Sequence, residues 1–170
     1  MNSSTVNLYT LGYREARTYL AATLFVLGNI ALPQLCHLVP QGGMTWLPIY
    51  FFTLIGAYKY GWRVGLLTAL ASPLLNAWLF GMPAVAALPA ILLKSCLLAG
   101  IAGFTASRLR RASLWMLALV VLGYQCLGTL GEWAIAGDFY LAAQDFRIGV
   151  PGMLVQVFGG WLFINHLIRK

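Results

Sequence analysis

The sequence predicts an all-α integral membrane protein, a bundle of six transmembrane helices with both termini in the cytoplasm. Of the 170 residues, 61% are hydrophobic and only 9% are charged, which is more apolar surface than a water-soluble domain needs. The apolar residues form continuous runs long enough to cross a bilayer, whereas the strands of a membrane barrel would alternate apolar and polar residues. Positive residues stand at the ends of these runs, as they do at the cytoplasmic ends of membrane helices.

Polar and helix-breaking residues divide the first apolar runs. A helix over about 17–38 follows a short polar tail, and Pro33 either bends this helix or marks its outer end. Residues 40–43, Pro-Gln-Gly-Gly, predict an uncharged external turn. A second, short helix over about 46–60 follows, and Pro48 suits its first turn.

The remaining runs predict four more helices in one membrane domain that covers residues 1–170. Gly61 predicts a tight inner turn before the third helix. The longest charged loop, residues 137–147, separates the fifth helix from the sixth. The four predicted helices cover about 63–80, 84–108, 114–136 and 149–168.

The positive residues predict the orientation of the bundle. With six spans, one membrane face has nine Lys and Arg residues and the other has Arg147 alone, while Lys94 falls within a span. Such an excess marks the cytoplasmic face. The nine are Arg14, Arg17, Lys59, Arg63, Arg108, Arg110, Arg111, Arg169 and Lys170.

Lys94 is the residue around which a candidate site can be built. It lies about ten residues from the outer end of the fourth helix, so about 15 Å deep. Gln125 of the fifth helix lies at a similar depth, and Glu132 lies about 6 Å deep. An ionisable residue at the midplane is costly, so Lys94 should face the protein interior and meet a partner, either Glu132 or a ligand.

Further amides share the outer half of the bilayer with Lys94. One interpretation is interhelical hydrogen bonding without a ligand, and the other is a polar cavity open to the outside. Taken with Lys94 and Glu132, the set favours a ligand cavity. Aromatic residues near its mouth, which include Tyr50, Trp78 and Tyr140 beside the two candidates named below, either belong to the interfacial belt or stack on a ligand ring. The amides are Asn29, Gln34, Asn76 and Gln156, and the aromatic residues are Trp46 and Trp133.

Small residues recur at four-residue spacing in the inner half. Such rows let helix backbones approach closely, which serves internal packing or the docking of another membrane subunit. The candidate docking residues are Gly61, Gly65 and Ala69 in the row Ala57, Gly61, Gly65, Ala69, together with Ala99 and Gly103 in the row Ser95, Ala99, Gly103, Ser107.

The composition excludes several classes of function. Four acidic residues, two histidines and three cysteines at unrelated spacings offer no catalytic constellation and no metal-ligand motif. Nucleotide-binding and hydrolase motifs are absent. The net charge of +7 stands at helix ends rather than on a soluble basic face, which argues against nucleic-acid binding. We expect no enzymatic activity, no cofactor and no metal.

Residues 32–100 carry a family resemblance. They contain an LP pair in the first helix, an outer turn, an LP pair that starts the second helix, and the inner turn GWRVGLL. These are followed by SPLLN and FGMP. With six short helices and about 170 residues, the chain resembles the substrate-binding S components of energy-coupling factor (ECF) transporters.

This resemblance implies a function in the cytoplasmic membrane of a bacterium or archaeon. An S component binds a vitamin or related micronutrient from outside, in the outer half among helices four to six. It then docks on a transmembrane T component and two ATPases, which drive release inside. The usual A-x-x-x-A docking motif of the first helix has only Thr18 and Ala22 as a near match, which would move docking to the small-residue rows.

Two other readings compete with this function. A structural membrane subunit, such as an MreD-like cell-shape protein, has comparable size and helix number. Such a subunit would need neither the buried lysine nor the amides that share the outer half of the bilayer with it. A small membrane enzyme is disfavoured by the missing acid–base groups.

Overall fold

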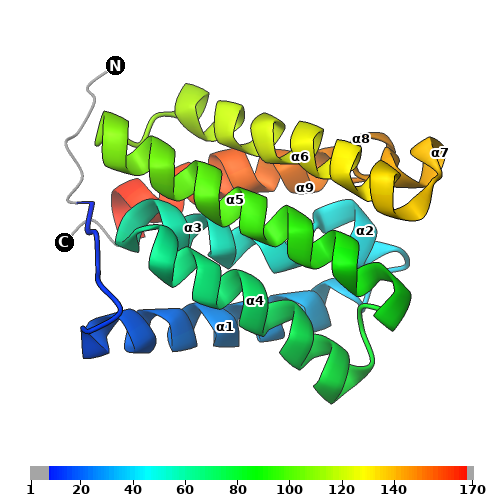
Figure 1. Cartoon of the computed structure of the whole chain (residues 1–170), viewed down its shortest axis with the longest axis horizontal. Coiled ribbons are helices and arrows are strands. Elements are labelled where there is room, and N and C mark those ends of the chain that lie inside the picture. The colour runs from blue at the N-terminus through cyan, green and yellow to red at the C-terminus, as the bar shows by residue number, and fades with distance from the viewer. Residues whose placement is uncertain (1–7, 168–170) are drawn as a thin grey trace.

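The computed structural model describes residues 8–167, and all regular secondary structure in this part of the chain is helical, as Figure 1 shows. Five of its helices are long and apolar enough to cross a membrane. The prediction of a multi-pass helical membrane protein is therefore confirmed at this level. The five are α1 (Ala16–Cys36), α4 (Trp62–Phe80), the segment Val85–Leu109 with η2 (Val85–Ala87) and α5 (Leu88–Leu109), α6 (Leu114–Ala136), and the C-terminal helix Val150–Leu167.

The C-terminal helix is continuous but changes its winding three times. Two of its four parts have the wider i to i+5 hydrogen-bonding pattern, which is most often found near functional or irregular contacts. The parts are α9 (Val150–Leu154), η3 (Val155–Gly159), α10 (Gly160–Leu162) and η4 (Phe163–Leu167).

The predicted second helix over 46–60 differs in the structure. It is divided into α2 (Gly42–Trp46), η1 (Pro48–Tyr50) and α3 (Phe51–Tyr60). Leu47 adopts a left-handed backbone, with φ of 47°, and Pro48 lacks the amide that would continue the helix. With ten residues, α3 is about 15 Å long, half the thickness of the hydrocarbon core. A sixth helix long enough to span the membrane is therefore not found in the described part of the chain.

The short helix α3 lies at the centre of the bundle. It is buried without a break from Thr53 to Lys59, and it packs against α1, α4 and α5. The N-terminal segment covers its last turn, because the amide of Tyr9 donates to the carbonyl of Lys59 at 2.8 Å. In Figure 1, α1, α4 and α6 run in one direction along the bundle, while α3, α5 and the C-terminal helix run in the other.

The small-residue rows pack helices within the chain. A Cβ added to Gly103 of α5 would lie 2.5 Å from the Cβ of Trp62 at the start of α4, and Gly65 of α4 packs equally closely on Ala57 of α3. Ala69 and Ala99 are fully buried. Gly61 is buried in a turn with φ of 99°. All five residues predicted to dock a partner are buried in internal packing, and docking of a partner subunit stays a prediction.

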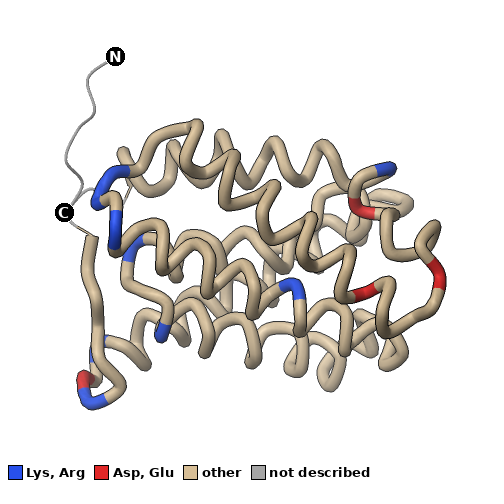
Figure 2. The backbone as a smooth tube through the Cα atoms, turned by 45° about the horizontal axis from the view of Figure 1, so that its top comes forward, with Lys and Arg blue, Asp and Glu red and all other residues tan. Residues whose placement is uncertain are grey.

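Charges segregate to the two ends of the bundle. Figure 2 shows Lys and Arg gathered at the end where α1 and α4 begin and α5 finishes, and most Asp and Glu at the opposite end. Lys94 differs from these residues, because it is buried within α5. Arg169 and Lys170, which also count toward the predicted cytoplasmic face, lie outside the described residues.

Candidate ligand-binding site

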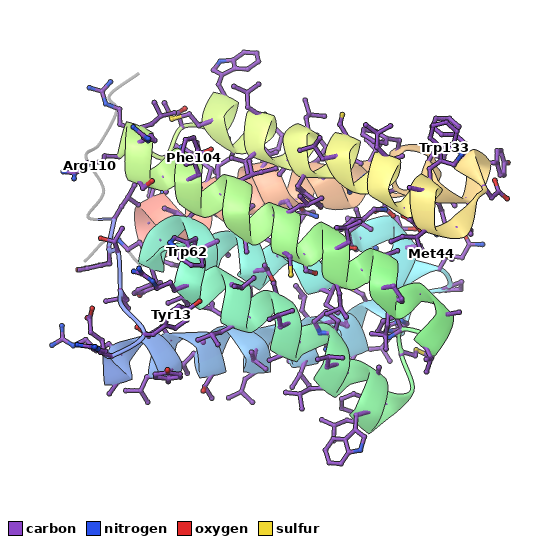
Figure 3. All side chains as sticks on the ribbon, in the orientation of Figure 1. Tyr13, Met44, Trp62, Phe104, Arg110 and Trp133 are labelled. Carbon is purple, nitrogen blue, oxygen red and sulfur yellow. The ribbon has the colours of Figure 1, made fainter. Side chains whose placement is uncertain are left out.

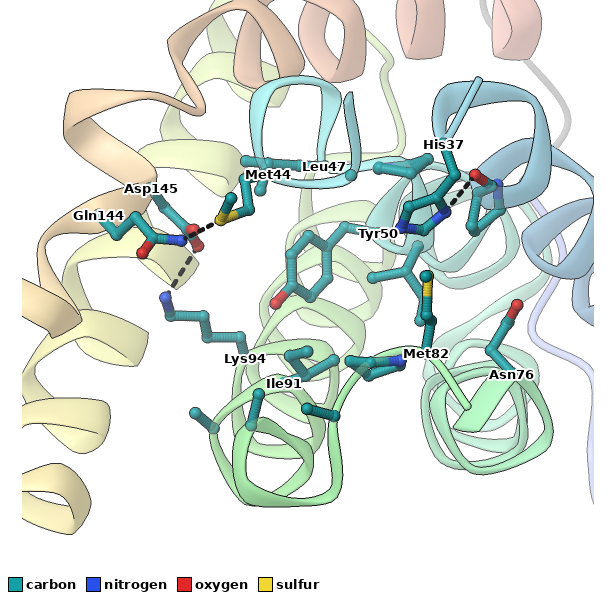
Figure 4. A pocket seen from close by; sticks show the side chains of 18 of the residues that line it. His37, Met44, Leu47, Tyr50, Asn76, Met82, Ile91, Lys94, Gln144 and Asp145 are labelled. Atoms are coloured by element: carbon teal, nitrogen blue, oxygen red, sulfur yellow. Dashed lines mark hydrogen bonds and ion pairs between the residues drawn. The ribbon is translucent and has the colours of Figure 1, made fainter. Parts of the chain in front are cut away.

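A cavity of about 390 Å³ opens at the acidic end of the bundle. Its wall combines the end of α1, the α2–η1 segment, Asn76 of α4, residues 82–84 with Ala87, the first turns of α5, Glu132 of α6, and α8 (Gln144–Arg147). Most lining residues are apolar, and the polar ones come from segments far apart in the sequence. Figure 4 shows Lys94 and Asp145 on one side of this space and His37 and Asn76 on the other.

Among the described residues that line the cavity, Lys94 alone carries a charged amine. Its Nζ lies 2.5 Å from Oε2 of Glu132 and 2.8 Å from Oδ2 of Asp145. The residue is 3% exposed, so its ammonium is almost completely removed from water. The pairing predicted with Glu132 is therefore present, and a second carboxylate completes it.

Gly128 of α6 makes room for the lysine stem. A Cβ at this position would lie 2.5 Å from Cγ of Lys94, so a larger residue would displace the side chain. Leu93 of α5 is equally close to Gly131, one turn further along α6. The two helices therefore approach closely where the lysine passes between them, which keeps its ammonium directed at the acidic end.

Asp145 is the functional residue that sequence reasoning missed. It sits on α8, in the segment predicted as an external charged loop, yet it is 9% exposed and its carboxylate accepts a hydrogen bond from Lys94. Two short helices fold this loop back: α7 (Phe139–Ala142), capped by the side chain of Asp138, and α8. The one available sequence signal was that a buried lysine needs enough counter-charge within reach.

The opposite wall offers mainly hydrogen-bond acceptors. Asn76 of α4 is 1% exposed, and its Nδ2 donates to the carbonyls of Asn29 and Ser72, both at 2.9 Å. Its Oδ1 has no hydrogen-bond partner within residues 8–167. His37 turns Nδ1 toward the carbonyl of Pro33 at 2.7 Å, so in a neutral ring Nε2 is the acceptor.

Tyr50 forms the buried aromatic part of the wall. It is 3% exposed, and its ring packs against Tyr124 of α6 at 5.5 Å between centroids. Figure 4 places the ring between Lys94 and Met82. At the mouth, Nε2 of Gln144 contacts the sulfur of Met44 at 2.9 Å.

Three of the nine predicted ligand-binding residues line the cavity: Lys94, Glu132 and Asn76. Asn29 instead joins helices, because its Nδ2 donates to Thr53 at 3.0 Å and to Ser72 at 3.2 Å. Its Oδ1 accepts from the amide of Phe52 at 3.1 Å. These contacts match the interhelical interpretation, since every amide atom of Asn29 has a protein partner.

The other predicted residues lie away from the cavity wall. Gln156 is fully buried and accepts a hydrogen bond from the hydroxyl of Tyr124 at 2.9 Å. Gln125 is also fully buried, and neither of its amide atoms has a partner in the described chain. Gln34 is half-buried on α1. Trp46 and Trp133 are 41% and 46% exposed, as residues of an interfacial belt would be.

The arrangement is suited to binding. It supplies charge, hydrogen-bond acceptors and an aromatic ring, but Lys94, Glu132 and Asp145 are engaged with one another. Within residues 8–167, no group of three or more His, Cys, Asp or Glu side chains is placed to hold a metal ion. Comparison with protein families, curated proteins and solved structures finds no match.

Proposed function

We propose that this chain is the substrate-binding subunit of an ECF-type transporter, which captures a vitamin or related micronutrient from outside the cell. The observation that carries the proposal is the position of the cavity. It opens at the end of the bundle opposite the arginine-rich end, with a buried charged group in its wall.

The orientation follows from the positive residues. The arginine-rich end, where α5 finishes, would face the cytoplasm together with both termini. The cavity would then open to the outside of a bacterial or archaeal cytoplasmic membrane. In this orientation α3 supplies the short crossing between the outer segment α2–η1 and the inner turn at Gly61, shielded from lipid by its neighbours.

The size and chemistry of the cavity support a small-molecule ligand. Sites for such ligands are commonly 300–1,000 Å³ in volume and mostly apolar, with a few polar groups that fix orientation. A volume of about 390 Å³ and a wall with one ion-paired lysine fit this description. Energy for uptake would come from a T component and two ATPases, in keeping with the resemblance of residues 32–100 to S components.

The first test is to purify the chain and identify any small molecule that it carries by mass spectrometry. A panel of vitamins is then screened for stabilisation against heat. A ligand at 100 times its Kd stabilises the folded state by about 2.7 kcal/mol. Copurification of a cell-shape partner with no ligand of any kind would instead support the MreD-like structural subunit.

Two adjacent residues of η2 give a matched pair of variants. Ala87 lines the cavity, while Ala86 is exposed and does not. Ala87→Trp should fill the mouth and abolish ligand stabilisation, whereas Ala86→Trp should leave it unchanged. Equal stabilisation of both variants by the same ligand would place binding elsewhere.

A further inference from the structure

We infer that the ligand of this cavity is an organic cation: a compact, largely apolar or aromatic molecule that carries an ammonium or another cationic nitrogen group. The inference rests on the proposed function, because it names the substrate class of the same site. Three features of the wall lead to it: the balance of charge, an unpartnered acceptor, and an aromatic ring.

The balance of charge comes first. One lysine lies between two carboxylates, so the three groups that line the cavity carry a formal charge of −1. Arg147 belongs to the same loop as Asp145 but does not line the cavity, and its guanidinium donates to the hydroxyl of Tyr140. The wall therefore holds one more negative charge than positive charge.

Lys94 is not free to receive an anionic ligand. Its Nζ already has an oxygen of Glu132 at 2.5 Å and an oxygen of Asp145 at 2.8 Å. A carboxylate or phosphate on the ligand would either displace one of them and leave it buried without its partner, or approach the third N–H and place a third negative group around one ammonium. Both arrangements are costly. A cation can instead approach the outer oxygens of either carboxylate while Lys94 stays in place.

The opposite wall is matched to a hydrogen-bond donor. Asn76 lines the cavity, and its Oδ1 is buried with no partner in the described chain. A buried acceptor without a donor is unfavourable. Nε2 of His37 is a second acceptor in the neutral ring. A nitrogen-bearing ligand would supply the donors that these atoms lack.

The ring of Tyr50 completes the site. It lies in the wall between the two sets of acceptors, as Figure 4 shows, and a cation over an aromatic face is attracted by the ring. Carboxylates, an amide oxygen and a ring face together would bind an alkylammonium or a flat aromatic cation. They would also disfavour the corresponding anion.

The test uses two matched series of probes whose members differ only in their terminal group. The first is tryptamine, tryptophol and indole-3-acetate, and the second is phenethylamine, phenethyl alcohol and phenylacetate. Binding to the full chain in lipid nanodiscs is measured by calorimetry and thermal shift at about pH 8, where an ordinary histidine is neutral. We expect the amine to bind at least about tenfold more tightly than the alcohol, a difference of about 1.4 kcal/mol, and the anion to bind most weakly.

Variants assign the preference to the carboxylates. Glu132→Gln and Asp145→Asn should each reduce the ratio of amine to alcohol affinity to near one. Asp138→Asn is the matched control, because Asp138 lies in the same loop, does not line the cavity, and caps α7 through an oxygen that asparagine also has. The melting temperature of each unliganded variant reports whether the fold is intact.

Three outcomes would overturn the inference. The first is tightest binding by the anions, and the second is an amine preference that survives both carboxylate variants. The third is a copurifying ligand that occupies the cavity and is neutral or anionic. Each of these leaves the proposed binding function in place. Failure of every probe and every vitamin to bind would refute the binding function itself.

Discussion

Replacement of Lys94 by methionine should destabilise the protein strongly, because it leaves two carboxylates buried without their cation. The oxygens of Glu132 and Asp145 both lie within 2.8 Å of Nζ, and the two side chains are only 18% and 12% exposed. Removing one partner from a buried ion pair typically costs about 3–5 kcal/mol. Methionine keeps most of the stem that passes Gly128, so the loss of packing is small.

The measurement is reversible unfolding in mixed micelles, followed by circular dichroism at a pH where carboxylates are ionised. Lys59→Met is the matched control. Lys59 is also fully buried, but its Nζ has no hydrogen-bond partner in the part of the chain that the structure describes. This ammonium lies over the ring of Tyr9, 5.4 Å from its centroid, and its removal loses that cation–π contact but also relieves the cost of a buried charge. Stability should therefore change much less than in Lys94→Met.

A combined variant separates charge from packing. Lys94→Met together with Glu132→Gln and Asp145→Asn removes all three charges, and it should recover most of the stability that the single variant loses. Hydrogen exchange should also show that α8 opens more readily in the single variant, because Asp145 loses its contact to α5. If Lys94→Met costs less than about 1 kcal/mol, or if the three substitutions add without coupling, the ion network described here does not hold the loop.

Three further substitutions test packing and hydrogen bonding. Gly103→Ala should lower the free energy of unfolding by about 1–3 kcal/mol, because the added Cβ would lie 2.6 Å from the Cα of Trp62. Gly100→Ala, in open space on the same helix, should raise it by up to about 1 kcal/mol. Asn29→Ala should cost about 2–4 kcal/mol through three lost hydrogen bonds while the affinity for a cavity ligand stays the same. Gln125→Met should stabilise the protein by about 1 kcal/mol, since neither amide atom of Gln125 has a protein partner within residues 8–167. A loss of ligand affinity in this variant would show that the cavity extends to Gln125.

The helices themselves could be predicted because apolar length and helix breakers determine them directly. The helix expected over 114–136 is found as Leu114–Ala136, and the one expected over 63–80 as Trp62–Phe80. The second helix could not be predicted in the same way. Apart from Thr53 and Lys59, residues 51–60 are apolar or aromatic on all sides, and this pattern is the same for a lipid-facing helix and for one surrounded by protein.

The candidate site could be predicted only where depth in the membrane decides position. Lys94, Glu132 and Asn76 were placed together by measuring residues from the outer helix ends, and all three line the cavity. Depth alone cannot say which side of a helix a residue occupies, so Asn29 and Gln156 were included although they join helices. Asp145 was missed because its burial depends on the fold of the loop after α6, which local sequence does not specify.

The ion network has a feature that stability alone does not explain. A protein is often as stable, or more stable, when a buried ion pair is replaced by apolar residues of similar volume. Stability alone therefore does not explain three charged side chains at this depth. The network joins α5, α6 and α8 at the wall of the cavity, and it leaves one carboxylate charge in excess. If its role is binding, the variant without the three charges should fold well and lose its preference for a cationic probe. If its role is only to hold the loop, that variant should keep the probe preference of the unmodified protein. Stability and probe preference, both measured on this one variant, therefore distinguish a role in binding from a role in holding the loop.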